Sequence, residues 1–290
     1  MKLELPTRSQ AHEEHIRKIA DMVVATGGKQ ILFVILFGSF ARGDWIFDRY
    51  SEDGIIYQYA SDYDFLIINR SKKNDGEISD FDLERKVSRA AGYLGGHKTH
   101  FVTESIDHVN SELEKGRYFF SDIKKEGILL YDSGEVELSE PRILTKKEIL
   151  ELARQDYEHW FHKGTRFLVN VLFNLQDNDL TTAAFLLHQA AESFYNCALL
   201  VQTGYKPKTH DLEELNKLCA AHNHEFLMIF PLATEEQKEC FKQLQKAYVE
   251  ARYNKHYRIT KEQLEYLINR VEKLKKIVEE VWEKRSLDLQ

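Results

Sequence analysis

The spacing of apolar residues changes character near the middle of the chain. Before residue 140, apolar positions follow both helical and strand periodicities. Residues 30–37 are apolar throughout and rich in Ile, Val and Phe, which is typical of a strand buried on both faces. The predicted elements are a helix over residues 10–26, strands over 30–37 and 63–68, a helix over 79–93 and a strand over 97–103. This order predicts an α/β (α+β) domain with a small mixed sheet.

After residue 140, apolar residues recur almost entirely at helical spacing. The last stretch shows this best, because its apolar residues form one stripe and its charged residues occupy the opposite face. Thr260 is expected to cap this helix, with Gln263 three positions on. The predicted helices span residues 145–175, 180–203, 211–222, 234–251 and 260–285. Because only short breaks separate them, they should form an all-α bundle of antiparallel neighbours.

Composition and charge change at the same position. Of the 14 glycines, 12 precede residue 141. Residues 1–140 carry 18 Lys and Arg against 25 Asp and Glu, whereas residues 141–290 carry 22 of each sign. The formal net charge of −7 therefore belongs entirely to the first part. These shifts predict two domains, 1–140 and 141–290, with the boundary near Pro141.

Three sequence features exclude classes of protein. The longest near-continuous apolar stretch, residues 31–37, is far too short to span a bilayer. The chain opens without a charged segment followed by an apolar one, so secretion is not expected. Cys197, Cys219 and Cys240 lack metal-type spacing and are expected to be reduced structural thiols. Together these features predict a cytoplasmic protein with no membrane partner.

A glycine-serine turn follows the first strand, and an aspartate pair begins the second. Gly38 lets the backbone approach a ligand, and the amides around Ser39 can bind an anion. Arg42 is placed to contact the same phosphates. Asp62 and Asp64, one residue apart on a strand, should project to one side and share divalent cations. The pattern predicts transfer of a nucleoside monophosphate from a nucleoside triphosphate with Mg²⁺ or Mn²⁺.

This segment resembles the DNA polymerase β nucleotidyltransferase superfamily, especially its small prokaryotic and aminoglycoside-modifying members. The resemblance rests on a Gly-Ser, Ala-Arg-Gly and Ser-Asp-x-Asp pattern at residues 38–43 and 61–64. It implies ATP as the donor and AMP as the transferred group. The implied nucleotide-binding residues are Gly38, Ser39, Arg42 and Gly43, and the implied catalytic metal ligands are Asp62 and Asp64.

The sequence departs from this family in two places. The family's aspartate pair follows the turn more closely, whereas here an aromatic-rich excursion, residues 45–60, intervenes. It is either a lid or stacking platform or, as we expect, packed against its own domain. The family also carries a third metal carboxylate on a later strand, and here His100 stands at that position. Because imidazole is a poor ligand for Mg²⁺, His100 leaves a catalytically impaired nucleotide-binding regulatory module as an alternative.

Two stretches of the second half, residues 187–195 and 204–215, resemble the HEPN family of helical bundles. In prokaryotes, HEPN domains often accompany such nucleotidyltransferases, including in toxin–antitoxin pairs. Many are metal-independent RNases in which Arg and His are separated by four to six residues. The matching residues here are Arg252 and His256, with only three residues between them. On a continuing helix they would lie near one face, Arg252 stabilising a phosphorane and His256 transferring a proton.

The favoured hypothesis is a nucleotidyltransferase that modifies a hydroxyl of a small molecule or protein. The acidic first domain supports this acceptor class, because binding to nucleic-acid backbones calls for clustered Lys and Arg. Asp64 is the candidate for orienting the attacking hydroxyl, with Glu192 as an alternative base. An RNase with a fused regulatory domain is a further alternative, and RNA is a partner only under that alternative. The apolar helix faces permit a homodimer.

Overall fold

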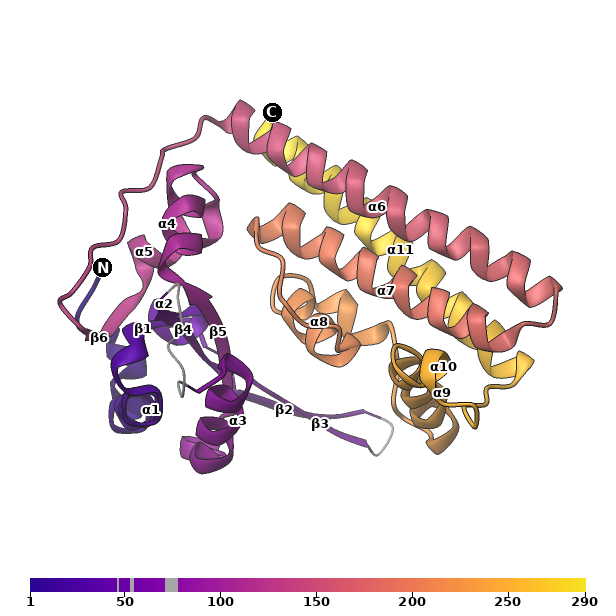
Figure 1. Cartoon of the computed structure of the whole chain (residues 1–290), viewed down its shortest axis with the longest axis horizontal. Coiled ribbons are helices and arrows are strands. Elements are labelled where there is room, and N and C mark those ends of the chain that lie inside the picture. The colour runs from indigo at the N-terminus through magenta and orange to yellow at the C-terminus, as the bar shows by residue number, and fades with distance from the viewer. Residues whose placement is uncertain (46, 53–54, 71–77) are drawn as a thin grey trace. The chain divides into compact units, whose positions relative to one another are not determined.

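The computed structural model describes residues 1–45, 47–52, 55–70 and 78–290. The chain divides into two compact units, Met1–Ile143 and Leu144–Gln290 (Figure 1). The first contains the sheets and the second is helical. No helix in the described ranges combines the length and apolar character needed to cross a membrane.

A four-stranded mixed sheet forms the centre of the first unit. Its strands, in spatial order, are β5 (Thr99–Ser105), β4 (Tyr63–Asn69), β1 (Ile31–Phe37) and β6 (Ile128–Asp132). β1 is antiparallel to both β4 and β6, whereas β4 and β5 are parallel. The predicted α/β (α+β) class with a small mixed sheet is therefore confirmed, and β1 is buried along almost its whole length as its apolar sequence predicts.

Helices cover this sheet and complete the first unit. Its helical segments are η1 (Thr7–His12), α1 (Glu13–Gly27), η2 (Gly28–Gln30), α2 (Gly38–Arg42), α3 (Asp80–Ala91), η3 (Leu94–Gly96), α4 (Ile106–Glu114) and α5 (Tyr118–Glu126). Apolar residues of α1 and α3 pack in one cluster with alternate residues of β1 and β4, including Val34, Phe65 and Ile67. Asp64 and Leu66 point to the opposite side of β4 because side chains alternate along a strand. Asp64 therefore lies on the face of the sheet opposite this apolar cluster.

A separate two-stranded hairpin occupies the predicted aromatic excursion. It consists of β2 (Phe47–Glu52) and β3 (Ile55–Ala60), which pair antiparallel (Figure 1). Trp45, just before it, stacks on Phe40 with ring centroids 5.1 Å apart. Packing is therefore confirmed for Trp45, while Phe47 is about half exposed. The side chains of the remaining aromatic residues of the excursion lie outside the described residues.

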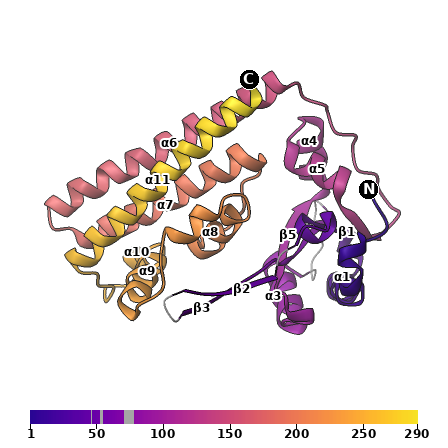
Figure 2. The ribbon, with the colours of Figure 1, turned by 180° about the vertical axis from the view of Figure 1, so that it is seen from behind.

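The second unit is a helical bundle built around one long buried helix. Its elements are α6 (Lys146–Gln176), α7 (Leu180–Thr203), α8 (Leu212–Ala220), η4 (His224–Met228), α9 (Glu235–Ala247), α10 (Glu250–Tyr253) and α11 (Lys261–Leu289). Figure 2 shows α6, α7 and α11 running beside one another. Nearly every residue of α7 from Ala183 to Val201 is buried. The capping box predicted from Thr260 and Gln263 is present at the start of α11.

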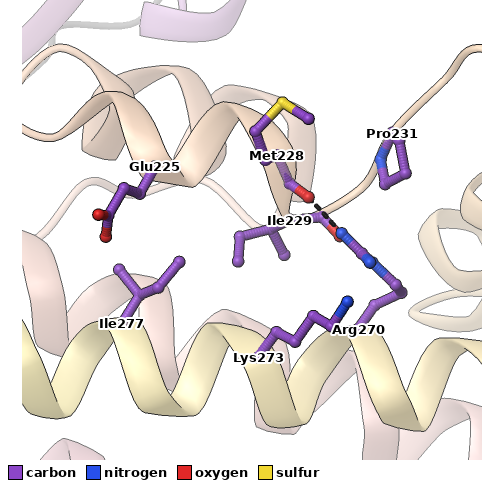
Figure 3. Close-up of a pocket in the computed structure, with 7 residues that line it drawn as sticks. All are labelled: Glu225, Met228, Ile229, Pro231, Arg270, Lys273 and Ile277. Atoms are coloured by element: carbon purple, nitrogen blue, oxygen red, sulfur yellow. Dashed lines mark hydrogen bonds between the residues drawn. The ribbon is translucent and has the colours of Figure 1, made fainter.

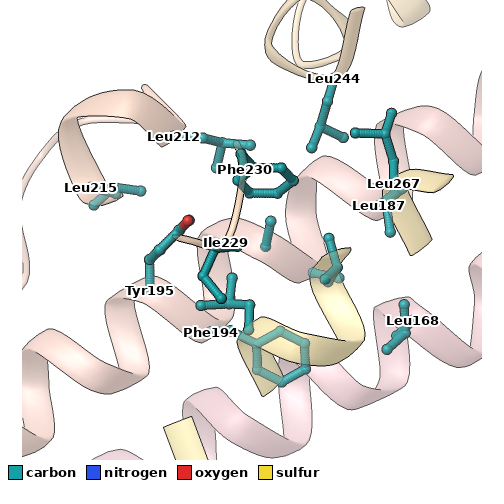
Figure 4. Close-up of a cluster of buried hydrophobic side chains, with 14 of the residues drawn as sticks. Leu168, Leu187, Phe194, Tyr195, Leu212, Leu215, Ile229, Phe230, Leu244 and Leu267 are labelled. Atoms are coloured by element: carbon teal, nitrogen blue, oxygen red, sulfur yellow. The ribbon is translucent and has the colours of Figure 1, made fainter. Parts of the chain in front are cut away.

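The core of this unit is continuous across its helices. Leu187 and Phe194 of α7 meet apolar residues of α6, α9 and α11, including Leu168, Leu244 and Leu267 (Figure 4). All three cysteines lie in this core as free thiols, as predicted. Burial raises the pKa of the Cys197 and Cys219 thiols, so both remain protonated.

Leu187 offers a direct test of this core. Leu187→Ala should lower the free energy of unfolding by about 2–5 kcal/mol, because it removes a fully buried side chain and leaves a cavity. The matched control is Leu287→Ala on α11, where the leucine is 71% exposed and the expected cost is about 0.5 kcal/mol or less. Urea unfolding monitored by circular dichroism measures both. Equal effects of the two substitutions would contradict the assignment of Leu187 to the core.

Candidate functional site

The glycine-serine turn and the aspartate strand meet at the end of β1. The last residue of β1, Phe37, pairs with Asp64 of β4, and Gly38 follows at once. Gly38 has φ +72°, a left-handed conformation that glycine adopts most easily. A Cβ at this position would overlap Oδ2 of Asp64 and lie 3.1 Å from its Cγ. Glycine is therefore needed here both for the backbone angle and for contact with the carboxylate.

His100 is the neighbour of Asp64 on the other side. β4 and β5 pair so that Asp64 and His100 are opposite each other, and His100 Nδ1 lies 3.0 Å from Asp64 Oδ1. His100 therefore stands beside Asp64, where the resemblance to the nucleotidyltransferases led us to expect a carboxylate. Glu104, the next carboxylate along β5, pairs with Ile68 instead and is buried. The residue beside Asp64 on β5 is thus an imidazole.

The donor set can be compared with what a divalent cation requires. Within the described ranges, no group of three or more His, Cys, Asp or Glu side chains could hold a metal ion. Asp64 lies on β4, and Asp62 directly precedes the first residue of this strand, Tyr63. Mg²⁺ commonly binds one or two carboxylates and takes its remaining oxygens from phosphates and water. Asp62 and Asp64 fit that requirement, whereas His100 does not.

Two histidines hold the residues on either side of Asp62. His97 Nδ1 donates to the carbonyl oxygen of Ser61 at 2.7 Å. His12 Nδ1 and the hydroxyl of Tyr63 are hydrogen-bonded at 2.6 Å. Tyr63 is fully buried, and His97 is almost so. The backbone that carries Asp62 is therefore fixed from the core on both sides.

Burial sets the protonation states of Tyr63 and His12. It raises the pKa of Tyr63 to about 12, so the hydroxyl stays protonated. Burial, followed by the nearby His97 and His15, lowers the pKa of His12 and favours its neutral form. A neutral His12 keeps a lone pair available for the Tyr63 hydroxyl. At neutral pH, the protonated Tyr63 hydroxyl can therefore donate a hydrogen bond to the neutral His12 ring.

The other predicted nucleotide-binding residues lie on and just after α2. Ser39 is in its first turn, and Arg42, at its end, donates from Nε to Asp44 at 3.0 Å. Arg42 is exposed, so its guanidinium can reach a ligand. Gly43 has φ +84°, and a Cβ there would lie 2.9 Å from Pro6. Gly43 is therefore required for backbone packing, and a role in binding nucleotide stays a prediction.

Three residues that the sequence did not indicate support the glycine-serine turn: Ser9, His12 and His97. The buried Ser9 donates its hydroxyl to the carbonyl of Phe40 at 2.7 Å, which ties η1 to α2. His12 and His97 belong to the same layer, with their rings 5.1 Å apart. These three residues lie in segments that carry no motif. Only their polar side chains could have indicated that they support the turn.

In the second unit, Arg252 and His256 do not share a helix. α10 ends at Tyr253, and His256 follows in a turn, so the expected continuing helix is wrong. The physical reason is local: the Asn254 side chain accepts from the His256 amide and diverts the backbone. Arg252 is exposed, and its guanidinium lies 4.6 Å from the centre of the Tyr248 ring.

A pocket in the described part of this unit lies elsewhere, between α11 and the segment around η4. It measures about 400 Å³ and is lined by Glu225, Met228, Ile229, Pro231, Arg270, Lys273 and Ile277 (Figure 3). Arg270 donates to the carbonyls of Met228 and Ile229. Its guanidinium therefore fastens the segment to α11.

Comparison with protein families identifies the second unit. Residues 157–281 match the HEPN domain. This part of the chain is a HEPN domain. The match covers α7 to α10 completely and most of α6 and α11, and it confirms the HEPN prediction for these residues. It includes Arg252 and His256 of the HEPN domain, although their roles stay predictions.

Other comparisons add less. Among solved structures, the chain is similar to the crystal structure of the protein TT1696 from Thermus thermophilus at 22% sequence identity, with a TM-score of 0.32. The similarity covers 43% of this chain and 97% of that one. No curated protein matches the sequence.

Proposed function

We propose that the first unit is a nucleotidyltransferase that transfers a nucleoside monophosphate, AMP from ATP, to a hydroxyl of a small molecule or protein. The observation that carries the proposal is the contact between Gly38 and Asp64. A glycine-serine turn that leaves a buried strand and faces an aspartate on the neighbouring strand can bring a phosphate chain next to a carboxylate. The acidic charge of residues 1–140 supports a small-molecule or protein acceptor.

Each residue has a role in this proposal. Backbone amides at Gly38 and Ser39 bind the phosphates, and Arg42 neutralises their charge. Asp62 and Asp64 would hold Mg²⁺ or Mn²⁺, and the ion would supply positive charge to the phosphate oxygens. Asp64 orients the acceptor hydroxyl. The hydroxyl oxygen forms a bond to the α-phosphorus, the bond to pyrophosphate breaks, and the hydroxyl proton is lost to a carboxylate or water.

The alternative is a regulatory module that binds nucleotide without transferring it. It is motivated by His100, which lies beside Asp64 where a carboxylate would complete the metal site. Under this alternative, the protein binds ATP with measurable affinity and forms no product.

The test is transfer of labelled AMP. The full chain is incubated with ATP labelled at the α-phosphate, Mg²⁺ or Mn²⁺, and hydroxyl-bearing small-molecule and protein acceptors. We expect incorporation by the wild type and a loss of at least about 100-fold in the double variant Asp62→Asn/Asp64→Asn, because even outer-shell changes at metal sites cost about 10–100-fold. The control is Asp21→Asn on the exposed face of α1. ATP binding without incorporation would contradict transfer and favour the regulatory module.

A second candidate function is cleavage of RNA by the HEPN domain. It is supported by the family match and by Arg252, whose exposed guanidinium is free to meet a phosphate while it packs on aromatic rings. Under this candidate, the two units carry different phosphoryl-transfer chemistries.

A further inference from the structure

A buried carboxylate holds one histidine of the HEPN domain in a fixed orientation. Glu192 of α7 is largely buried, and its Oε1 lies 3.0 Å from His210 Nδ1. Its Oε2 accepts from Gln189 Nε2 at 3.1 Å. Both carboxylate oxygens are therefore engaged. Because Nδ1 is directed at Glu192, Nε2 is the ring nitrogen of His210 that remains for a ligand, and half of the His210 side chain is exposed.

His210 and Arg252 both lie against the ring of Tyr248. The imidazole stacks on Tyr248 with centroids 4.4 Å apart and an interplanar angle of 19°. The Arg252 guanidinium lies 4.6 Å from the centre of the same ring, and its Nε donates to the Tyr248 carbonyl at 2.7 Å. The ring thus fixes a proton-transferring group and a permanent cation within one neighbourhood.

The loop that carries His210 is tied to α9. The Gln245 side chain accepts from the amide of Leu212 at 2.9 Å and donates to Asp211 at 2.8 Å. A pocket of about 330 Å³ opens here, lined by His210, Asp211, Gln245, Lys246 and Tyr248. His210 is therefore positioned by Glu192 of α7 and by Tyr248, which directly follows α9, beside an open pocket, although it lies outside regular structure.

Cationic side chains predominate in the segment that begins at Lys246, which lines this pocket. Residues 246–258 contain four Lys and Arg, against Glu250 as the one acidic residue. Asp211 lines the same pocket, and its Oδ1 accepts from the two amides that begin α8 and from the Gln245 side chain. Lys246 lies 4.0 Å from Glu250, a long and weak ion pair. Arg252 and Lys246 are thus the cations available to a phosphate.

We propose that His210, oriented by Glu192, is the proton-transferring residue of the HEPN domain, and that Arg252 binds the phosphodiester. This inference rests on the second candidate function. The 2′-oxygen of RNA bonds to phosphorus while its proton passes to His210 Nε2. The bond from phosphorus to the 5′-oxygen then breaks, and His210 returns the proton to that oxygen. The products are a 2′,3′-cyclic phosphate and a 5′-hydroxyl, and Arg252 offsets the charge that develops on the non-bridging oxygens.

His256 is less suited to this role. It lies in an exposed turn after α10, and in the part of the chain that the structure describes no hydrogen bond or ion pair orients its ring. A general acid–base residue gains from a fixed orientation and from a partner that stabilises its protonated form. Glu192 gives both to His210.

The test compares the two histidines in the full chain. Single-stranded RNA oligonucleotides are incubated with the wild type, His210→Asn, His256→Asn and Arg252→Ala in the presence of EDTA, which suppresses metal-dependent transfer. We expect cleavage by the wild type, a loss of at least about 100-fold in His210→Asn, and a change within about twofold in His256→Asn. Oligonucleotides with 2′-deoxy substitution at the cleavage site should bind His210→Asn as tightly as they bind the wild type, which shows that the variant is folded.

Glu192→Gln supplies a readout that a merely structural role would not move. Replacing the carboxylate by an amide should lower kcat by about 10-fold or more and leave KM within about twofold, because the amide oxygen can still accept from His210 Nδ1 but no longer offsets the charge that the ring gains during proton transfer. An unchanged kcat would contradict the positioning role. Cleavage that is retained in His210→Asn and lost in His256→Asn would overturn this inference but would leave the second candidate function standing. Absence of cleavage in the wild type would overturn the second candidate function together with it.

Discussion

Replacing Gly38 by alanine should reduce nucleotidyl transfer by at least about 100-fold while the first unit remains folded, because a displacement of about 1 Å at a reacting group can cost that much. The added Cβ would overlap Oδ2 of Asp64, so either the carboxylate or the turn must move. Both hold groups that the proposed reaction needs. The effect should appear in transfer of labelled AMP from ATP and, to a smaller extent, in ATP affinity.

Gly28 provides a matched control for this substitution. It also has a left-handed backbone, with φ +58°, but a Cβ there meets no atom within 4 Å. Gly28→Ala and Gly38→Ala should therefore both lower stability, because a residue other than glycine is strained at a positive φ. Only Gly38→Ala should lose activity. Equal activity of the two variants would show that the contact between Gly38 and Asp64 is unimportant for transfer.

The HEPN domain should lose stability on acidification because of His188. This histidine is fully buried on α7, and its Nδ1 lies 3.9 Å from Glu192 Oε2, beyond hydrogen-bond distance. Burial, followed by the nearby His210, lowers its pKa to about 4. The folded state therefore binds a proton less readily than the unfolded state, whose histidine has a pKa of about 6.5. The contribution of His188 is fully present above about pH 6.5 and is lost as the pH falls toward 4, by about 2–3 kcal/mol.

His188→Leu tests the source of this loss. Leucine removes the ring nitrogens while filling an apolar site, so the variant should lose less stability than the wild type between pH 7 and pH 4.5. His162→Gln on an exposed position of α6 should lose as much as the wild type. Hydrogen exchange of the α7 amides, measured by mass spectrometry at both pH values, reports this domain separately. Parallel losses in His188→Leu and the wild type would exclude His188 as the cause.

The contrast between the two halves shows what periodicity can predict. The long helices of the second unit have apolar residues repeated over many turns, and α6, α7 and α11 lie close to the predicted ranges. In the first unit, α4, α5, β6 and the β2–β3 hairpin were not predicted. They are short, so few residues carry their pattern, and long-range pairing stabilises the strands.

The sequence by itself determined the buried strand at residues 31–37, the aspartate strand after it and the helical second half. These follow from local patterns, since runs and spacings of apolar residues restrict which backbone conformations can bury them. Only the tertiary structure decided that Gly38 touches Asp64, that His12 and His97 hold the residues flanking Asp62, and that Glu192 orients His210 rather than remaining a free base. These contacts join segments that are far apart in the chain. Their geometry depends on how whole elements pack, which no local spacing encodes.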